Sequence, residues 1–375
     1  MKVVIAIDSL KGCLSSAEAG HAAADGVRAR WPEAEIVCLP VSDGGEGWLE
    51  AIGGADSPPA LPIREGAKCS EQASALLSSQ VTSLITITVN DPLLRPVQAR
   101  YLLAGETAVI EVAQACGLHL LRPEERNPLL ASSRGVGELL LDAAQRGARR
   151  FIIGLGGSAV SDAGRGMVER VKEEKREKRK REKGSEECSF ILATDVTNPL
   201  YGPNGAAAIF GPQKGATMEM VEELDRRARA FAEENARRMG FDRSGDAGAG
   251  AAGGLGYAFM QFFDAERRSG AELLLELLHF DELIRDVDLV ITGEGKADRQ
   301  TLMGKLPAVI LRHAQRAGVP CHLLAGDVQD TSSLLAAGFA SVRSINPPDL
   351  PLHEALCADV ARQNMEHTSY DMIIA

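Results

Sequence analysis

The sequence predicts an α/β fold: a Rossmann-like, doubly wound, mostly parallel sheet with a second α/β domain inserted into it. Short β-branched runs alternate with stretches of helical period along most of the chain. Many of these runs are apolar throughout, as strands buried on both faces are. Glycine supplies 38 of the 375 residues, which suits many tight turns between strands and helices.

The predicted strands are short apolar runs, each ending in a polar turn. In chain order they are Val3–Ile7, Ile36–Pro40, Leu84–Val89, Ala108–Val112, Phe151–Leu155, Phe190–Ala193, Asp288–Thr292, Cys321–Ala325 and Ser341–Ile345. Helices of ordinary length separate several of them. This spacing predicts right-handed crossovers between parallel strands.

The first predicted helix, Ser15–Arg30, opens with Ser15-Ser16-Ala17-Glu18, the S-x-x-E pattern of a capping box. The other predicted helices are Arg134–Arg146, Thr217–Met239, Ala271–Asp286, Gly304–Ala317 and His353–Glu366. The apolar, glycine-containing stretch Ala247–Phe263 is predicted to be a loop that runs into a buried helix.

The two ends of the chain give clean βα units, whereas the middle mixes strands, glycine loops and a long charged helix. We therefore predict a discontinuous Rossmann-like domain from residues 1–62 and 285–375, with an inserted α/β domain at 63–284. Within the insert, thirteen of the fourteen residues from Arg170 to Lys183 are charged. Residues 168–188 are predicted to be either a solvated helix with i,i+4 ion pairs or a disordered segment.

Composition narrows the class of protein. The 52 acidic and 41 basic side chains give a net charge of −11, which argues against nucleic acid or an anionic membrane as partner. The seven cysteines form no CxxC pair, so we interpret them as core thiols in a reducing compartment. With no signal-like or membrane-spanning run, the expected location is cytoplasmic, and assembly into a homo-oligomer stays open.

Four predicted strands are each followed by a polar turn that holds glycine and an acid. These turns are Asp8-Ser9-Leu10-Lys11-Gly12, Ser42-Asp43-Gly44-Gly45-Glu46-Gly47, Gly293-Glu294-Gly295-Lys296-Ala297-Asp298, and Gly326-Asp327. In an open parallel sheet they meet at the carboxyl edge, where ligands bind. Gathered acids cost free energy unless a cation offsets them, and Mg²⁺ with a polyphosphate would do so. Alternatively, Asp8, Asp43 and Asp298 cap helices or turns.

Two further glycine motifs lie in the middle of the chain. The first, Gly154-Leu155-Gly156-Gly157-Ser158-Ala159, comes at the end of a predicted strand and matches G-x-G-x-x-A, a pattern of dinucleotide-binding turns. No ribose-binding acid follows about twenty residues later, which argues against a nicotinamide oxidoreductase. Gly248–Gly253 matches G-x-G-x-x-G after polar residues, and it is either a ligand-facing loop or a site of close packing. No P-loop pattern occurs.

In order along the chain, these residues resemble those of the bacterial type I glycerate kinase family. The matching segments are Val4–Gly12, Ser42–Gly47, Ala108–Glu111, Gly154–Ser158 with Asp162, Asp195–Leu200, Gly211–Gly215, Gly250–Gly256, and Ile291–Gly295 with Asp298, Gln300 and Thr301. The resemblance implies the two-domain fold above and an ATP- and Mg²⁺-dependent kinase that converts D-glycerate to 2-phosphoglycerate. Two alternatives remain. The product could be 3-phosphoglycerate, or the chain could be a catalytically impaired relative that still binds nucleotide, because the segment before Asp195 is short.

The resemblance also implies which residues form the site, and the roles are hypotheses. Asp8, Lys11 and Asp195 are the candidate catalytic residues, and Asp43 and Glu294 are the candidate metal ligands. The candidates for binding substrate or phosphate are Ser9, Gly44, Gly45, Gly156, Gly157, Ser158, Asn198, Gln213, Lys214, Gly253, Gly254 and Asp298. We expect Lys11 to stabilise the transferred phosphoryl group, Asp195 or Asp8 to accept a proton, and Lys214 or Arg95 to bind the carboxylate.

Overall fold

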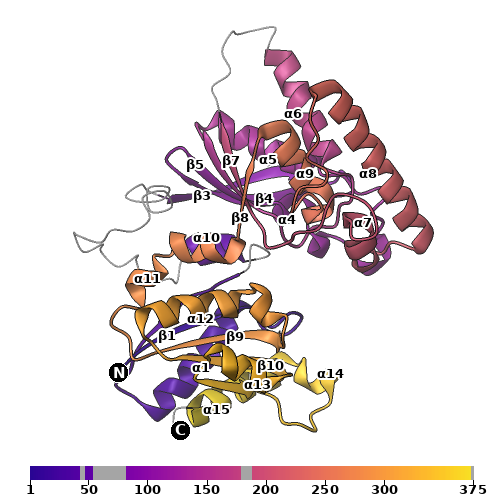
Figure 1. Ribbon diagram of the computed structural model, residues 1–375. Coiled ribbons are helices and arrows are strands. Elements are labelled where there is room, and N and C mark those ends of the chain that lie inside the picture. The colour runs from indigo at the N-terminus through magenta and orange to yellow at the C-terminus, as the bar shows by residue number, and fades with distance from the viewer. Residues whose placement is uncertain (43–46, 54–81, 179–187, 373–375) are drawn as a thin grey trace. The chain divides into compact units, whose positions relative to one another are not determined.

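The computed structural model describes residues 1–42, 47–53, 82–178 and 188–372 (Figure 1). The chain forms two compact units. The first unit comprises Met1–Asp43, Glu50–Ala75 and Ala271–Ala375, and the second comprises Gly44–Leu49 and Leu76–Gly270. The predicted boundary between residues 62 and 63 lies outside the described residues. The other predicted boundary, at residues 284 and 285, comes later in the chain than the break before Ala271.

The first unit contains a five-stranded sheet in which every strand pair is parallel. Its order is β11-β10-β9-β1-β2, with bounds β1 Lys2–Ile7, β2 Glu35–Cys38, β9 Leu289–Ala297, β10 Cys321–Val328 and β11 Ser341–Ser344. β1 lies between two neighbours and is apolar from Val3 to Ile7, where no residue is more than 1% exposed. This sheet confirms the predicted parallel α/β class.

Helices cover both faces of this sheet. α1 (Ser16–Arg30) and α15 (Ala358–Met372) pack against each other and against the face of β1 that presents Val3, Ile5 and Ile7. α12 (Leu306–Ala317) lies across the opposite face (Figure 1). The predicted capping box of α1 is confirmed, because Ser15 and Glu18 each accept a backbone N–H of the other. Shorter helices are α13 (Thr331–Ala337), α14 (Leu352–Ala355) and the 3-10 turn η4 (Thr301–Met303), and the break between the two units falls within α2 (Trp48–Gly53).

A buried histidine joins α12 to two short helices, α10 (Gly270–Leu277) and α11 (Phe280–Leu283). His313 is 5% exposed; its Nδ1 lies 2.5 Å from Asp281 Oδ1 and its Nε2 lies 2.9 Å from Glu272 Oε2. Since both ring nitrogens face carboxylates, both donate only when the ring is protonated. Burial disfavours the charged ring, but the hydrogen bonds that it donates to Glu272 and Asp281 outweigh the burial and raise the pKa of His313.

This contact predicts a pH-dependent stability. The pKa of His313 is higher in the folded than in the unfolded chain. The stability that its protonated ring contributes is therefore complete below about pH 6.5 and is lost as the pH rises through the folded pKa. We expect the free energy of unfolding, measured by urea titration across this range, to fall with pH in the native chain. In His313→Gln the free energy of unfolding at low pH should be about 1–3 kcal/mol lower than in the native chain, and its fall with rising pH should be absent. Parallel pH dependence in the two proteins would contradict the assignment.

The second unit contains a six-stranded mixed sheet of order β3-β4-β5-β6-β7-β8. The bounds are β3 Thr82–Asn90, β4 Pro96–Ala104, β5 Thr107–Glu111, β6 Arg150–Gly154, β7 Ser189–Ala193 and β8 Glu266–Arg268. β3, β4 and β5 pair antiparallel, and β5 to β8 pair parallel. All nine predicted strands occur among the eleven described strands; β4 and β8 were not predicted.

The helices of the second unit are α4 (Ala113–Cys116), α5 (Arg134–Gln145), α6 (Arg165–Lys178), α7 (Ala206–Phe210), α8 (Met218–Met239) and α9 (Ala251–Phe263), with 3-10 turns η1 (Leu118–Leu120), η2 (Pro123–Glu125) and η3 (Pro212–Lys214).

The charged segment is helical up to Lys178. Met167, Val168 and Val171 bury one side of α6, while Arg170 pairs with Glu174 one turn away. The rest of that segment, residues 179–187, lies outside the description. None of the described helices has the length and apolar content needed to cross a bilayer.

Candidate functional site

The acidic loops of the first unit lie at the carboxyl edge of its sheet. The backbone N–H of Asp8 donates to Gly293 O at 2.9 Å, and Ile7 pairs with Gly293 in the register of β1 and β9. Asp8 and Glu294 therefore follow paired positions on neighbouring strands. The predicted ligands Asp43, Gly44 and Gly45 lie in the part of the chain that is not described.

β9 and β10 extend further than predicted. The Gly293–Ala297 and Gly326–Asp327 stretches were predicted as turns, but they continue the two strands, with Ala325 paired to Glu294 and Asp327 to Lys296. Glycine permits the close approach, because a Cβ on Gly293 would come within 2.3 Å of Leu324 O. Glu294 is thus held on a strand and not on a loop.

Glu294 is almost wholly buried and is paired with groups of the protein. It is 7% exposed; its Oε1 accepts the Thr301 hydroxyl at 2.5 Å and its Oε2 accepts the Lys305 ammonium at 3.0 Å. Asp298 orders the turn that carries Thr301, since its Oδ1 accepts the Gln300 N–H at 2.8 Å. Asp298 therefore stabilises a turn, as the alternative interpretation of these acids expects.

Asp8, Ser9 and Lys11 lie on the loop that follows β1. The backbone N–H of Ser9 donates to Asp8 Oδ1 at 2.7 Å, which orients that carboxylate. Lys11 is exposed, and the loop turns at Gly12, where φ is +79°. The Lys11 backbone lies beside β9, because a Cβ on Gly295 would be 3.8 Å from Lys11 N. Lys11 therefore provides an exposed ammonium at the same sheet edge as Asp8 and Glu294.

The second unit has a corresponding edge. Glu111, Gly154, Ala193 and Arg268 are in register at the ends of β5, β6, β7 and β8. Asp195 follows β7 and is exposed. Glu111 is 2% exposed and accepts the Leu49 N–H at 2.8 Å. Glu111 was not among the predicted site residues, and its place at the end of an apolar strand was the signal that could have identified it.

The turn Gly156–Ser158 follows β6 at this edge. Gly157 has φ of +66° and its carbonyl accepts the Leu118 N–H at 2.8 Å, while Ala159 N–H donates to Cys116 O at 2.7 Å. The backbone N–H groups of Gly156, Gly157 and Ser158 donate no hydrogen bond to any described residue. Successive N–H groups around a left-handed glycine form a concavity that binds anions. This turn can hold a phosphate or a carboxylate.

Lys214 lies behind that turn. It is 3% exposed, and its ammonium donates to Val160 O at 2.7 Å and to Ser158 Oγ at 3.1 Å. Burial lowers the pKa of Lys214 to about 8, although Cys116 and Asp162 act in the opposite direction. Asp162 itself accepts hydrogen bonds from Ser133, Gly164 and Gly166, so it joins the start of α6 to the loop before α5.

Gly253 and Gly254 are close-packing positions. Both have positive φ and interrupt α9. A Cβ on Gly253 would lie 1.9 Å from Val160 O, and one on Gly254 would lie 2.6 Å from the Cα of Ala163. These contacts match the close-packing interpretation of the Gly248–Gly253 motif.

Alanine at Gly253 should therefore destabilise the second unit. We expect Gly253→Ala to lower the free energy of unfolding by about 2–5 kcal/mol, because left-handed strain and overpacking act together. Gly245→Ala is the control, since a Cβ there meets nothing within 4 Å. Thermal and urea denaturation of the two variants would test this, and equal stabilities would refute the packing role.

The remaining predicted residues of this unit lie on loops. Asn198 donates from Nδ2 to Asn204 O at 2.9 Å, and its carbonyl accepts the Gly250 N–H at 2.8 Å. Gln213 is exposed on η3. Arg95, an alternative cation for a substrate carboxylate, pairs with Asp91 at 2.6 Å and Glu125 at 2.8 Å. Its charge is already balanced within the protein.

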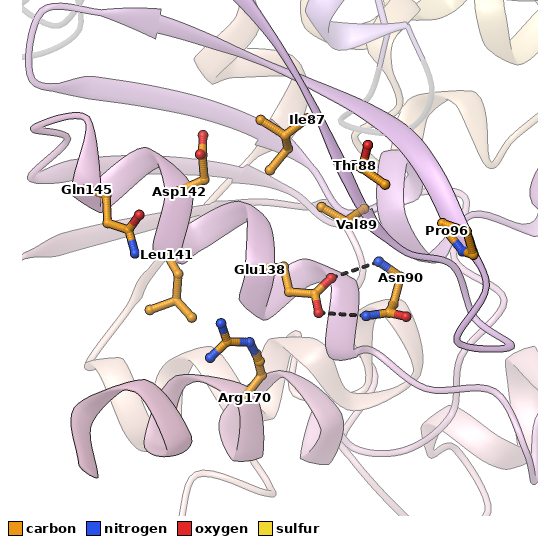
Figure 2. Close-up of a pocket in the computed structure, with 10 residues that line it drawn as sticks. All are labelled: Ile87, Thr88, Val89, Asn90, Pro96, Glu138, Leu141, Asp142, Gln145 and Arg170. Atoms are coloured by element: carbon orange, nitrogen blue, oxygen red, sulfur yellow. Dashed lines mark hydrogen bonds between the residues drawn. The ribbon is translucent and has the colours of Figure 1, made fainter. Parts of the chain in front are cut away.

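A pocket of about 410 Å³ lies between the β3–β4 hairpin, α5 and α6 (Figure 2). The carboxylates that line it are hydrogen-bonded to neighbouring residues. Glu138 accepts hydrogen bonds from the backbone and side-chain nitrogens of Asn90, each at 2.7 Å, and Asp142 accepts one from the Tyr101 hydroxyl at 2.6 Å. None of the predicted site residues lines it. The pocket is therefore separate from the candidate site.

Metal-binding clusters of three or more His, Cys, Asp or Glu side chains are absent from the described residues. The six described cysteines are free thiols, and Cys69 lies outside the description. Mg²⁺ takes one or two carboxylates when phosphate and water complete its shell.

Comparison with known proteins identifies relatives over nearly the whole chain. The sequence profile of the Glycerate kinase family matches residues 3–58 and 59–374. "Glycerate kinase" of Bacillus subtilis strain 168 is 36% identical, covering 99% of this chain and 97% of the relative. "Glycerate 2-kinase" of Escherichia coli K12 is 38% identical, covering 88% and 86%. A solved Salmonella typhimurium LT2 structure, described as a candidate glycerate kinase 2, is 35% identical with a TM-score of 0.73, covering 100% of this chain and 97% of that one.

Proposed function

Because the chain belongs to the glycerate kinase family, we propose that it transfers the terminal phosphoryl group of ATP to D-glycerate, with Mg²⁺ as cofactor and 2-phosphoglycerate as product. The Escherichia coli relative is named for phosphorylation at the 2-position, and this name supports the choice of hydroxyl. The relatives are kinases, so the enzyme class is a phosphotransferase.

The Gly156–Ser158 turn is the observation that supports this function best. Its three successive N–H groups, without acceptors among the described residues, offer donors to an anion at the carboxyl end of β6. Both the phosphates of ATP and the carboxylate of glycerate are anions of the kind that such a turn binds. We propose that the turn holds one of them.

The first sheet edge carries carboxylates of the kind that bind Mg²⁺, although both oxygens of Glu294 already accept hydrogen bonds from Thr301 and Lys305. Asp8 and Glu294 are carboxylates that follow paired positions of β1 and β9. We propose that Asp43 or Glu294 holds the ion, with Asp8, which follows the paired position on β1, as an added candidate. Mg²⁺ bound to the phosphates would neutralise part of the charge that develops during phosphoryl transfer. Lys305, which pairs with Glu294, would keep that carboxylate in place.

The chain's own residues supply the rest of the chemistry. We propose that Lys11 donates hydrogen bonds to the transferred phosphoryl group, which its exposed position permits. The reacting hydroxyl loses its proton as it attacks phosphorus, and Asp195 is the proposed acceptor. Asp8 is the alternative acceptor if it does not bind the metal.

Phosphorus NMR of the products from D-glycerate and MgATP tests the proposal. A phosphate on the secondary carbon of 2-phosphoglycerate couples to one proton and gives a doublet, whereas 3-phosphoglycerate couples to two and gives a triplet. We expect ADP and a glycerate-dependent doublet. A triplet would contradict the proposed hydroxyl, and nucleotide binding without any product would support the impaired relative instead.

A further inference from the structure

We propose that Lys214 is a positioning residue: its buried ammonium holds the Gly156–Ser158 turn in shape from the protein interior and does not contact substrate. This inference rests on the proposed function, because that function makes the turn the anion-binding element. It assigns Lys214 a different role from the one predicted from the sequence, which was direct binding of a carboxylate or phosphate.

The contacts of Lys214 are to the turn itself. The ammonium donates to Ser158 Oγ at 3.1 Å and to Val160 O at 2.7 Å, so it joins the last residue of the turn to the segment that follows. Gly157 is exposed, whereas Lys214 is 3% exposed. The lysine therefore reaches the turn from its buried side.

Other groups contact the segment that follows the turn, residues 159–163. Gly253 packs against Val160 O, the acceptor of the shorter Lys214 hydrogen bond, and Ala163 N–H donates to Gly253 O at 3.1 Å. On another side, Ala159 N–H donates to Cys116 O at 2.7 Å. The turn is thus held by backbone on two sides and by one charged side chain.

Burial of a charged ammonium at this position costs free energy, because the charge loses its hydration. Burial lowers the pKa of Lys214 to about 8, although Cys116 and Asp162 act in the opposite direction. A methionine would fill a similar volume without desolvating a charge. What the methionine could not supply is the pair of hydrogen bonds to Ser158 and Val160. The ammonium is therefore explained by the orientation of the turn and not by packing.

The test compares four variants of the full chain. Lys214→Met removes both hydrogen bonds at similar volume, Ser158→Ala removes only one acceptor, and the third variant combines them. Lys172→Met is the matched control: Lys172 is also partly buried in the second unit, where its ammonium lies 4.8 Å from the Phe262 ring centroid, but it does not contact the turn. Circular dichroism and thermal melting would confirm that each variant is folded.

We expect Lys214→Met to lower kcat by about 10²-fold, the loss that a misplacement of about 1 Å produces, with much smaller changes in KM for ATP and D-glycerate. Ser158→Ala should lose less. The double variant should resemble Lys214→Met alone, because both substitutions remove the same connection. Lys172→Met should keep native kinetics.

Three results would overturn the inference: native kcat in folded Lys214→Met, a large rise in KM for one substrate with kcat preserved, or additive losses in the double variant. The second would show that Lys214 contacts that substrate. If the native chain makes no phosphoglycerate, the proposed function fails. If the native chain is active and Lys214→Met is equally active, only the role of Lys214 fails.

Discussion

Replacement of Asp195 by asparagine is expected to lower kcat by about 10²-fold or more, with little change in KM, because asparagine keeps the shape of the side chain but cannot accept a proton. Asp195 is an exposed carboxylate two residues after β7, which pairs with β6, the strand that the Gly156–Ser158 turn follows. The secondary hydroxyl of glycerate is a poor nucleophile until its proton is accepted. Steady-state kinetics with D-glycerate and MgATP measure both constants.

Asp264→Asn is the control for this variant. Asp264 lies in the same unit, its side chain is 96% exposed, and its left-handed backbone (φ +49°) suits asparagine equally well. The control should retain native kinetics. Near-native turnover in Asp195→Asn would exclude Asp195 as the proton acceptor, and Asp8 would be tested next in the same way.

Replacement of Lys11 by alanine is expected to lower kcat/KM by at least about 10²-fold, the loss found when a preorganised donor to developing charge is removed. Lys11 is exposed on the loop after β1, at the sheet edge that also carries Asp8 and Glu294. The charge that it would stabilise grows as the phosphoryl group transfers, so kcat should account for much of the loss.

Lys2→Ala is the matched control, because Lys2 lies at the start of β1, whereas Lys11 lies on the loop that follows the end of β1. The Lys2 ammonium is 3.5 Å from Glu35 at an exposed position, so its removal should change neither kinetics nor folding appreciably. If Lys11→Ala matches this control in kcat/KM, Lys11 has a structural role only, and the charge on the transferring group is stabilised elsewhere.

The strands of this fold could be predicted well because buried parallel strands are apolar throughout. All nine predicted strands are present, and the capping box of α1 is as expected. β4 was missed because its start, Pro96-Val97-Gln98-Ala99-Arg100, mixes proline and polar residues, as a strand in an antiparallel hairpin tolerates. β8 has only three residues, Glu266–Arg268, and carries no apolar signal.

The long helices were predicted, but the short helices α2, α4, α7 and α13 were not, and the ends of predicted helices were often misplaced. The predicted helix Ala271–Asp286 is two helices, α10 and α11, separated where His279 adopts φ of +52°. The predicted helix His353–Glu366 is also divided, into α14 and α15. Apolar periodicity continues across such breaks, so it does not show where the backbone leaves the helical conformation.

The sequence by itself determined the parallel α/β class, nine of the eleven described strands and the acid- and glycine-bearing segments at their carboxyl ends, because these depend on local hydrophobic pattern and turn chemistry. Only the tertiary structure decided how the individual polar side chains are used. Glu294 pairs with Lys305, Asp298 orders a turn, and Lys214 is buried behind the Gly156–Ser158 turn. These partners come from segments distant in sequence or from loop geometry, and the burial that sets their charge and contacts exists only once the chain has packed.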